Sequence, residues 1–212
     1  MKDDRLIEDA KTWVREKMAT GAGHDWGHIE RVVVNARRLA EAEGADLRVV
    51  ELAAWMHDVV NLPKDHPERA SASTKSAEAA CQWLQGRLEE ERVELVREAI
   101  RCHSFSAGLI PQSLEAKVVS DADNLDALGA IGIARVFEIG GALGKSTLAS
   151  KDPFCHEREP DDGRYTVDHF YTKLLKLGDR FYTDSGRRQA QERLGFMRQF
   201  LEILESEVTN CP

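Results

Sequence analysis

The sequence predicts an all-α fold, a single-domain helical bundle with a polar flap before its C-terminal helices. Apolar residues recur three and four positions apart along almost the whole chain, which is the spacing of one face of an α-helix. Strand patterns are weak, and no hairpin dipeptide separates two alternating runs. A chain of 212 residues with 42% hydrophobic and 31% charged residues is long enough to bury one sizeable core.

Three helices are expected in the N-terminal part of the chain. The first covers 5–19 and stops at a glycine-bearing turn, and the second runs from residue 25 or 26 to about 43. Gly44 ends this second helix, because glycine readily adopts the left-handed conformation that follows a helix. The third is predicted over 46–59, with Asp46 as its N-cap.

Further helices and one long polar segment follow. Helical patterns cover 68–86, 90–103, 113–128, 130–142, 166–177 and 186–208. The polar stretch 144–165 is too long for a simple connection, so it is either disordered or a flap over the functional site. We favour the flap, because Phe154, His156 and Tyr165 are costly side chains to leave in a disordered segment.

Charge and composition exclude several classes of function. The net charge of -8 leaves no basic excess to neutralise a nucleic-acid polymer or an anionic membrane. No apolar run reaches the roughly 18 residues that a membrane span needs. The four cysteines lack CxxC spacing, and we expect them to be free thiols in a reducing cytosol. We therefore expect a cytoplasmic protein with a small-molecule partner, and its apolar helix faces also allow a homodimer.

Four side chains form a candidate metal-ligand set: His28, the adjacent pair His57 and Asp58, and Asp123. Two imidazoles and two carboxylates suit a hard or borderline divalent ion. Four ligands leave further coordination positions open to water and substrate, as a catalytic metal requires. His28 is expected in the first turn of one helix, and His57 and Asp58 in the last turn of the next. A short turn between antiparallel helices brings these two ends together.

The segment that contains Asp123 carries three carboxylates with different orientations. Asp121 and Asp123 lie about 200° apart around a helix and so cannot do the same job. Asp123 and Asp126, three residues apart, share a face more closely. Helical geometry alone therefore separates the roles of these residues without assigning them.

Four segments resemble the HD-domain superfamily of metal-dependent phosphohydrolases, and the small bacterial HD hydrolases in particular. They are HDWGHIERV at 24–32, AAWMHDVVNLPKDHPER at 53–69, AIRCHSFS at 99–106 and KVVSDADNLDALGAIGIARVF at 117–137. The resemblance extends to DPFCHE and DHFYTKLLKL and so covers nearly the whole chain. It implies one all-α phosphohydrolase domain over 1–212, with a core at 20–130 and a C-terminal helical extension at 131–212.

The same resemblance implies that His28, His57, Asp58 and Asp123 hold the metal. In the DxD segment of the superfamily the second carboxylate is usually the ligand, so Asp121 becomes an orienting or substrate-contacting residue.

The resemblance also implies a single metal ion. HD enzymes with two metals add further histidines between the HD pair and the last aspartate, and here only His66 and His103 lie there. Mn²⁺ fits two histidines and two carboxylates well, and Fe²⁺, Co²⁺, Ni²⁺ and Mg²⁺ remain alternatives.

Catalytic and substrate-binding roles are assigned to residues around this set. His103 is expected as a proton donor or phosphate contact. Asp121, Asp25 or His24 would orient the water or an imidazole. Some HD nucleotidases place a glutamate three residues after the HD aspartate, but this chain has Asn61, which cannot act as a base. The residues expected to contact substrate are Asn61, Lys64 and Arg69.

Two classes of function remain open. The first is a phosphohydrolase of a small nucleotide-type phosphate, either cleaving a nucleoside triphosphate to monophosphate and pyrophosphate or acting as a phosphomonoesterase on nucleoside monophosphates or sugar phosphates. The second is a non-catalytic module that binds metal and nucleotide. Retention of all four ligands favours the enzyme.

Overall fold

The structure, a computed structural model, describes residues 2–19, 26–60, 62, 66, 68–104 and 107–209, with backbone only at 2–4, 19 and 69. These residues form nine α-helices and no β-strand, so the predicted all-α fold is confirmed. Within them, no helix combines the length and the apolarity that crossing a bilayer requires.

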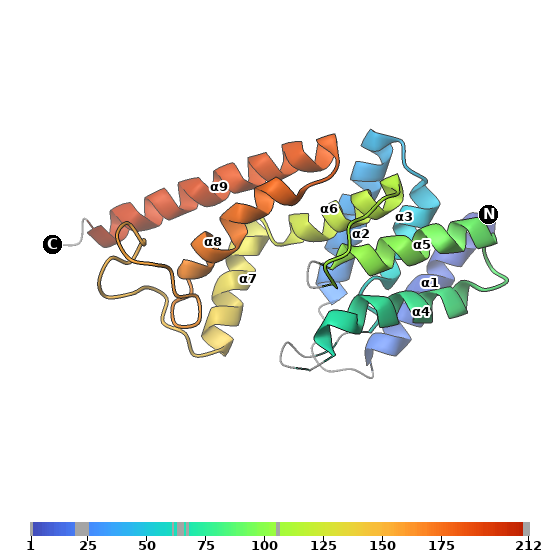
Figure 1. The fold of residues 1–212 in the computed structure, drawn as a ribbon, viewed down its shortest axis with the longest axis horizontal. Coiled ribbons are helices and arrows are strands. Elements are labelled where there is room, and N and C mark those ends of the chain that lie inside the picture. Colours follow the sequence, from blue (N-terminus) through green and yellow to red (C-terminus); the bar gives the residue numbers. More distant parts are fainter. Residues whose placement is uncertain are drawn as a thin grey trace. The chain divides into compact units, whose positions relative to one another are not determined.

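The chain forms two compact units, which are described separately. The first unit contains Met1–Asp123 and Tyr182–Gly186, and the second contains Asn124–Phe181 and Arg187–Pro212. Two of the boundaries between the units fall inside helices, α6 (Leu114–Asp126) and α9 (Asp184–Thr209), and the third precedes α9 (Figure 1). The assignment of a core at 20–130 and an extension at 131–212 stays a prediction.

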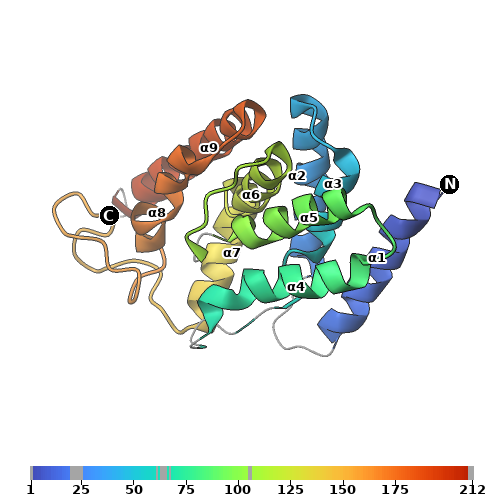
Figure 2. The same ribbon diagram turned by 45° about the vertical axis from the view of Figure 1, so that its right-hand side comes forward.

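Helix α3 (Leu47–Met56) lies at the centre of the first unit. It contacts α1 (Lys2–Ala19), α2 (Trp26–Glu43), α4 (Ala72–Leu84) and α5 (Glu90–His103). Helices α4 and α5 pack side by side (Figure 2), and the short 3-10 helix η1 (Arg69–Ser71) precedes α4. The buried side chains of α3 are Val49, Val50, Leu52, Ala53, Ala54, Trp55 and Met56. A helix surrounded in this way has little room for polar groups except at its ends.

The two ends of α3 are set by polar side chains. Asp46 is the N-cap, as predicted: its Oδ1 accepts hydrogen bonds from the backbone N–H of Arg48 (3.1 Å) and Val49 (3.3 Å). The helix ends at Met56, however, so the prediction that it continues to residue 59 with His57 and Asp58 in its last turn is wrong. His57 is the C-cap, its backbone angles are still helical, and its side chain bonds back to the helix.

Two contacts bring the ligand-bearing parts of other helices to α3 and α6. The rings of Trp26 and Trp55 stack with centroids 5.4 Å apart, which joins the start of α2 to the end of α3. The buried Asn35 donates from Nδ2 to the carbonyl oxygen of Ala122 (3.4 Å), which joins α2 to α6 next to Asp123.

The second unit contains α7 (Gly129–Ala142), α8 (Asp168–Thr172), the 3-10 helix η3 (Leu174–Arg180) and most of α9. Phe137, Phe170 and Phe200 form an aromatic cluster with ring centroids 6.0–6.3 Å apart. The helix predicted over 166–177 is divided, because the backbone leaves helical geometry at Lys173.

The polar stretch 144–165 is an ordered loop of the second unit. The Arg158 guanidinium pairs with both oxygens of the buried Asp168 (2.5 and 2.7 Å). Asp152 accepts hydrogen bonds from the backbone N–H groups of residues 156–158. The interpretation of this loop as a flap over the functional site stays a prediction.

Replacing Asp46 by alanine should lower the free energy of unfolding by about 1 kcal/mol, because two N–H groups of α3 lose their acceptor. Urea unfolding followed by circular dichroism measures the change. Asp46→Asn keeps a capping oxygen but loses the charge that pairs with Arg92 (3.0 Å), so it separates the cap from the ion pair. Equal losses in both variants would contradict the capping role.

Candidate metal centre

The four predicted ligands converge at one place in the first unit. His28 lies in the first turn of α2, and its Nε2 is 3.3 Å from His57 Nε2 and 3.3 Å from Asp123 Oδ1. His57 Nε2 is 3.9 Å from Asp123 Oδ1 and 4.0 Å from Asp58 Oδ2. Ligand atoms of His28, His57 and Asp58 all lie within 4.8 Å of one another. His28, His57 and Asp58 thus form one compact group, and Asp123 of α6 contacts both of its histidines.

These separations fit a single divalent ion. Two ligands that each lie about 2.1 Å from an ion are about 3.0 Å apart at a right angle and about 3.4 Å apart at the tetrahedral angle. The observed separations of 3.3–4.0 Å need only a small contraction around an ion. The donor set is two imidazole nitrogens and two carboxylates, which suits Mn²⁺ and similar ions.

The end of α3 gives His57 the orientation that its predicted role as a ligand requires. Its ring is fully buried, and Nδ1 lies 2.8 Å from the carbonyl oxygen of Ala54. A carbonyl oxygen only accepts, so Nδ1 carries the proton and Nε2 presents its lone pair to His28 and Asp123. A ligand histidine commonly uses its second nitrogen in this way, which fixes the tautomer and the ring orientation.

The helix end also explains how two adjacent residues reach one site. Neighbours on a helix point about 100° apart, which would direct the Asp58 side chain away from that of His57. Because α3 ends at Met56, Asp58 lies beyond the helix and its carboxylate reaches both His57 and His103.

The carboxylates and imidazoles shift one another's pKa. Burial alone would raise the pKa of Asp123, but the hydrogen bond from His28 and the charges of the three histidines outweigh it and lower the pKa to about 2. Burial likewise opposes ionisation of Asp58, and its hydrogen bond with His103 and the charges of the histidines hold its pKa well below the ordinary range. Burial lowers the pKa of His57. The site therefore holds two carboxylates in their charged form and one imidazole in its neutral form, the forms in which each binds a metal.

His103 lies directly beside the ligand set. Its Nδ1 donates to the carbonyl oxygen of Ile100 (2.6 Å), and its Nε2 is 3.7 Å from Asp58 Oδ1. Its ring packs edge-on against His57 with centroids 4.8 Å apart. Burial opposes protonation, but the hydrogen bond and charge of Asp58 and the charge of Asp123 raise the pKa of His103.

Asp121 occupies a different environment. It is fully buried, and its oxygens accept hydrogen bonds from the backbone N–H groups of Tyr182 (2.9 Å) and Thr183 (2.8 Å) and from the Thr183 hydroxyl (2.7 Å). Residues 182–186 carry no local sequence signal of this contact, because their partner Asp121 lies some sixty positions away. The catalytic role of Asp121 stays a prediction.

Several predicted residues lie outside the described part of the chain. They are His24, Asp25, Asn61 and Lys64. Arg69 opens η1, but its side chain is also outside the description. Their roles in catalysis and substrate binding stay predictions.

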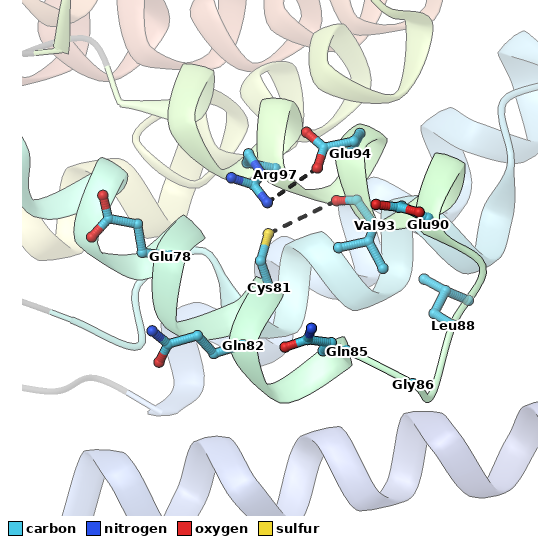
Figure 3. A pocket seen from close by; sticks show the side chains of 10 residues that line it. All are labelled: Glu78, Cys81, Gln82, Gln85, Gly86, Leu88, Glu90, Val93, Glu94 and Arg97. Carbon is cyan, nitrogen blue, oxygen red and sulfur yellow. Dashed lines mark hydrogen bonds and ion pairs between the residues drawn. The ribbon is translucent and has the colours of Figure 1, made fainter.

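A separate pocket of about 450 Å³ lies between α4 and α5 (Figure 3). The Cys81 thiol at its wall points to the carbonyl oxygen of Val93 (3.9 Å), and Arg97 pairs with Glu94 (3.1 Å). Burial raises the pKa of Cys81, so this thiol stays protonated. None of the predicted site residues within the described ranges lines the pocket, so it is distinct from the ligand set.

Comparison with known proteins gives consistent matches. A sequence model of the HD domain family matches residues 25–128, which include all four predicted ligands. The Bacillus subtilis protein YpgQ is 36% identical over 98% of this chain and 96% of its own length. A crystal structure of an HD-superfamily hydrolase from Bacillus thuringiensis, 36% identical, superimposes with a TM-score of 0.79 over 99% of this chain and 100% of that one. The crystal structure of YpgQ in complex with ADP, 34% identical, has a TM-score of 0.74 over 98% and 97% of the two chains.

Asp58→Ala should lose metal while the fold persists. The change removes a charged ligand, so metal affinity should fall by more than the roughly 10–100-fold that loss of an outer hydrogen-bond partner costs. Metal content after equilibration with Mn²⁺ and dialysis measures the loss, and circular dichroism measures the fold. Asp123→Ala should behave alike, and Glu41→Ala, on the exposed side of α2, should bind like the wild type. Full metal content in Asp58→Ala would remove this residue from the site.

In the metal-free protein, His57 should titrate below the ordinary histidine value of 6.5 and His103 above it. The raised pKa of His103 contributes stability that is present below pH 6.5 and is lost as the pH rises through the folded-state value. The lowered pKa of His57 acts oppositely, because only the unfolded chain binds a proton there as the pH falls below 6.5. NMR titration of the imidazole signals, assigned with His57→Gln and His103→Gln, measures both values. The reverse order would contradict the burial and pairing described above.

Proposed function

Because this chain belongs to the HD domain family and is a metal-dependent phosphohydrolase, we propose that its substrate is a small nucleotide phosphate. The proposed reaction is cleavage of a nucleoside triphosphate to the monophosphate and pyrophosphate. The observation that carries the proposal is the cluster of His28, His57 and Asp58 with Asp123 beside the two histidines. The binding of ADP by the related YpgQ supports a nucleotide as the ligand class.

The proposed cofactor is one divalent ion, with Mn²⁺ preferred over Fe²⁺, Co²⁺, Ni²⁺ and Mg²⁺ because the donor set mixes imidazole nitrogen and carboxylate oxygen. When bound, such an ion polarises a phosphoryl oxygen and lowers the pKa of a water molecule at the site. Each of the four ligands supplies one donor atom, and the two carboxylates balance the charge of the ion.

His103 is the proposed proton donor to the leaving group. Its Nε2 faces the site beside Asp58, and its pKa is raised above the ordinary histidine value, which favours the protonated ring. In-line displacement at phosphorus needs a proton for the leaving oxygen and neutralisation of the equatorial oxygens. We assign the second task to Lys64 and Arg69, with Asn61 as a further substrate contact. Orientation of the attacking water is assigned to His24 and Asp25.

We place the enzyme in the cytoplasm, where nucleotides and reduced thiols occur together. Cys81 and Cys102 are free and buried, in keeping with a reducing compartment. A homodimer stays a prediction.

A product assay tests the reaction. The metal-stripped protein is refilled separately with Mn²⁺, Co²⁺, Ni²⁺ and Mg²⁺, given nucleoside mono- and triphosphates, and its products are separated as orthophosphate or pyrophosphate. Pyrophosphate from triphosphates, highest with Mn²⁺ and absent in Asp58→Ala, is the expected result. Orthophosphate from monophosphates would replace the proposal with a phosphomonoesterase. Stoichiometric nucleotide binding without product would replace it with a binding module.

A further inference from the structure

The start of α9 is held by a buried carboxylate of α6. Asp121 has no exposed surface, and it receives hydrogen bonds from Tyr182 N, Thr183 N and Thr183 Oγ1 at 2.7–2.9 Å. A buried charge is tolerated only when such partners replace its lost water. The positive end of the α9 helix dipole adds to the stabilisation. We call Asp121 and its partners Tyr182, Thr183 and Gly186 the Asp121 clasp.

Thr183 has two roles in the clasp. Its hydroxyl donates to Asp121 Oδ2, and the same oxygen accepts a hydrogen bond from the backbone N–H of Gly186 (3.0 Å). The second bond makes Thr183 the N-cap of α9, which begins at Asp184. One hydroxyl thus couples the capping of α9 to the orientation of the Asp121 carboxylate.

Gly186 is required by this close approach. A Cβ atom at this position would overlap Asp121 Oδ2 and lie 2.7 Å from Thr183 Oγ1. Any side chain at this position forces the carboxylate or the hydroxyl to move. The arrangement of Asp121 and Thr183 therefore requires a glycine at position 186.

The same helix turn is also bound to α2. The backbone N–H of Ser185 donates to Glu43 Oε1 (2.6 Å), and Glu43 is the last residue of α2. Helices α2 and α6 carry the ligands His28 and Asp123. Residues 182–186 therefore bind both helices whose relative position sets the 3.3 Å contact between these ligands.

Asp121 precedes Asp123 by two residues, so the two side chains leave α6 on opposite sides, about 200° apart. A hold on the Asp121 side limits rotation of α6 about its axis and so limits displacement of Asp123. We propose that Asp121 is a positioning residue, which acts through Thr183 and Gly186 to aim Asp123 at the metal. This inference rests on the proposed metal site and adds to it a control of metal affinity from the first turn of α9.

The test is direct Mn²⁺ titration of the full chain, with thermal unfolding and steady-state rates measured in parallel. Thr183→Val removes the hydroxyl but keeps the branched shape, and Thr183→Ser restores the hydroxyl. Gly186→Ala forces Asp121 or Thr183 to move, while every hydrogen-bonding group of the clasp is kept. Ser185→Ala is the matched control, because its hydroxyl is buried in the same turn with no hydrogen-bond partner among the described residues.

We expect Thr183→Val and Gly186→Ala to bind Mn²⁺ about tenfold or more weakly, the range for loss of an outer partner of a metal ligand. Thr183→Ser and Ser185→Ala should bind like the wild type, and all four should approach the wild-type kcat at saturating Mn²⁺. Wild-type affinity in Thr183→Val, or equal weakening in Ser185→Ala, would overturn the clasp. A fall in kcat at saturating metal without a change in affinity would also overturn it and would give Asp121 a catalytic role. A wild-type protein that binds no metal would instead overturn the proposed site itself.

Discussion

The structure of the first unit depends on the burial of α3. This helix is apolar and contacts four other helices, so its C-terminal end is the place where polar groups meet. His57 lies at that end with no exposed surface, and its Nδ1 is satisfied by its own helix. The remaining nitrogen must find partners without help from water. The ring is surrounded by polar side chains in place of water, namely His28, Asp58, Asp123 and His103.

Without a bound cation, the stability of this cluster depends on the protonation of its histidines. Two carboxylates and three imidazoles at separations of 3.3–4.0 Å stabilise each other only if some imidazoles carry protons. A divalent ion held by the predicted ligands would provide the same positive charge at a single point, which protons on separate rings cannot do. Metal and protons therefore compete for the site, and the low pKa values of Asp58 and Asp123 leave the competition to the histidines.

The parts of the fold that are encoded locally could be predicted from the sequence. Helix α5 begins and ends where its pattern indicated, and Asp46 caps α3 as expected. The end of α3 was misplaced, because the apolar pair Val59 and Val60 extends the hydrophobic pattern past Met56, where the helix ends. Periodicity separated Asp121 from Asp123 but did not assign their roles. Their partners come from distant parts of the chain, and no local pattern reports such contacts.

The two carboxylates of α6 have different neighbours because they lie on opposite sides of the helix. Asp123 faces imidazoles and a place for a cation, whereas Asp121 faces the N–H groups at the start of α9. The family match covers 25–128 and includes both aspartates, but the partners of Asp121 lie at 182–183. The segment matched by the family model therefore lacks residues 182 and 183, which donate three hydrogen bonds to the buried Asp121. Because a buried carboxylate is costly without hydrogen-bond donors, residues 182–186 are a structural part of the first unit.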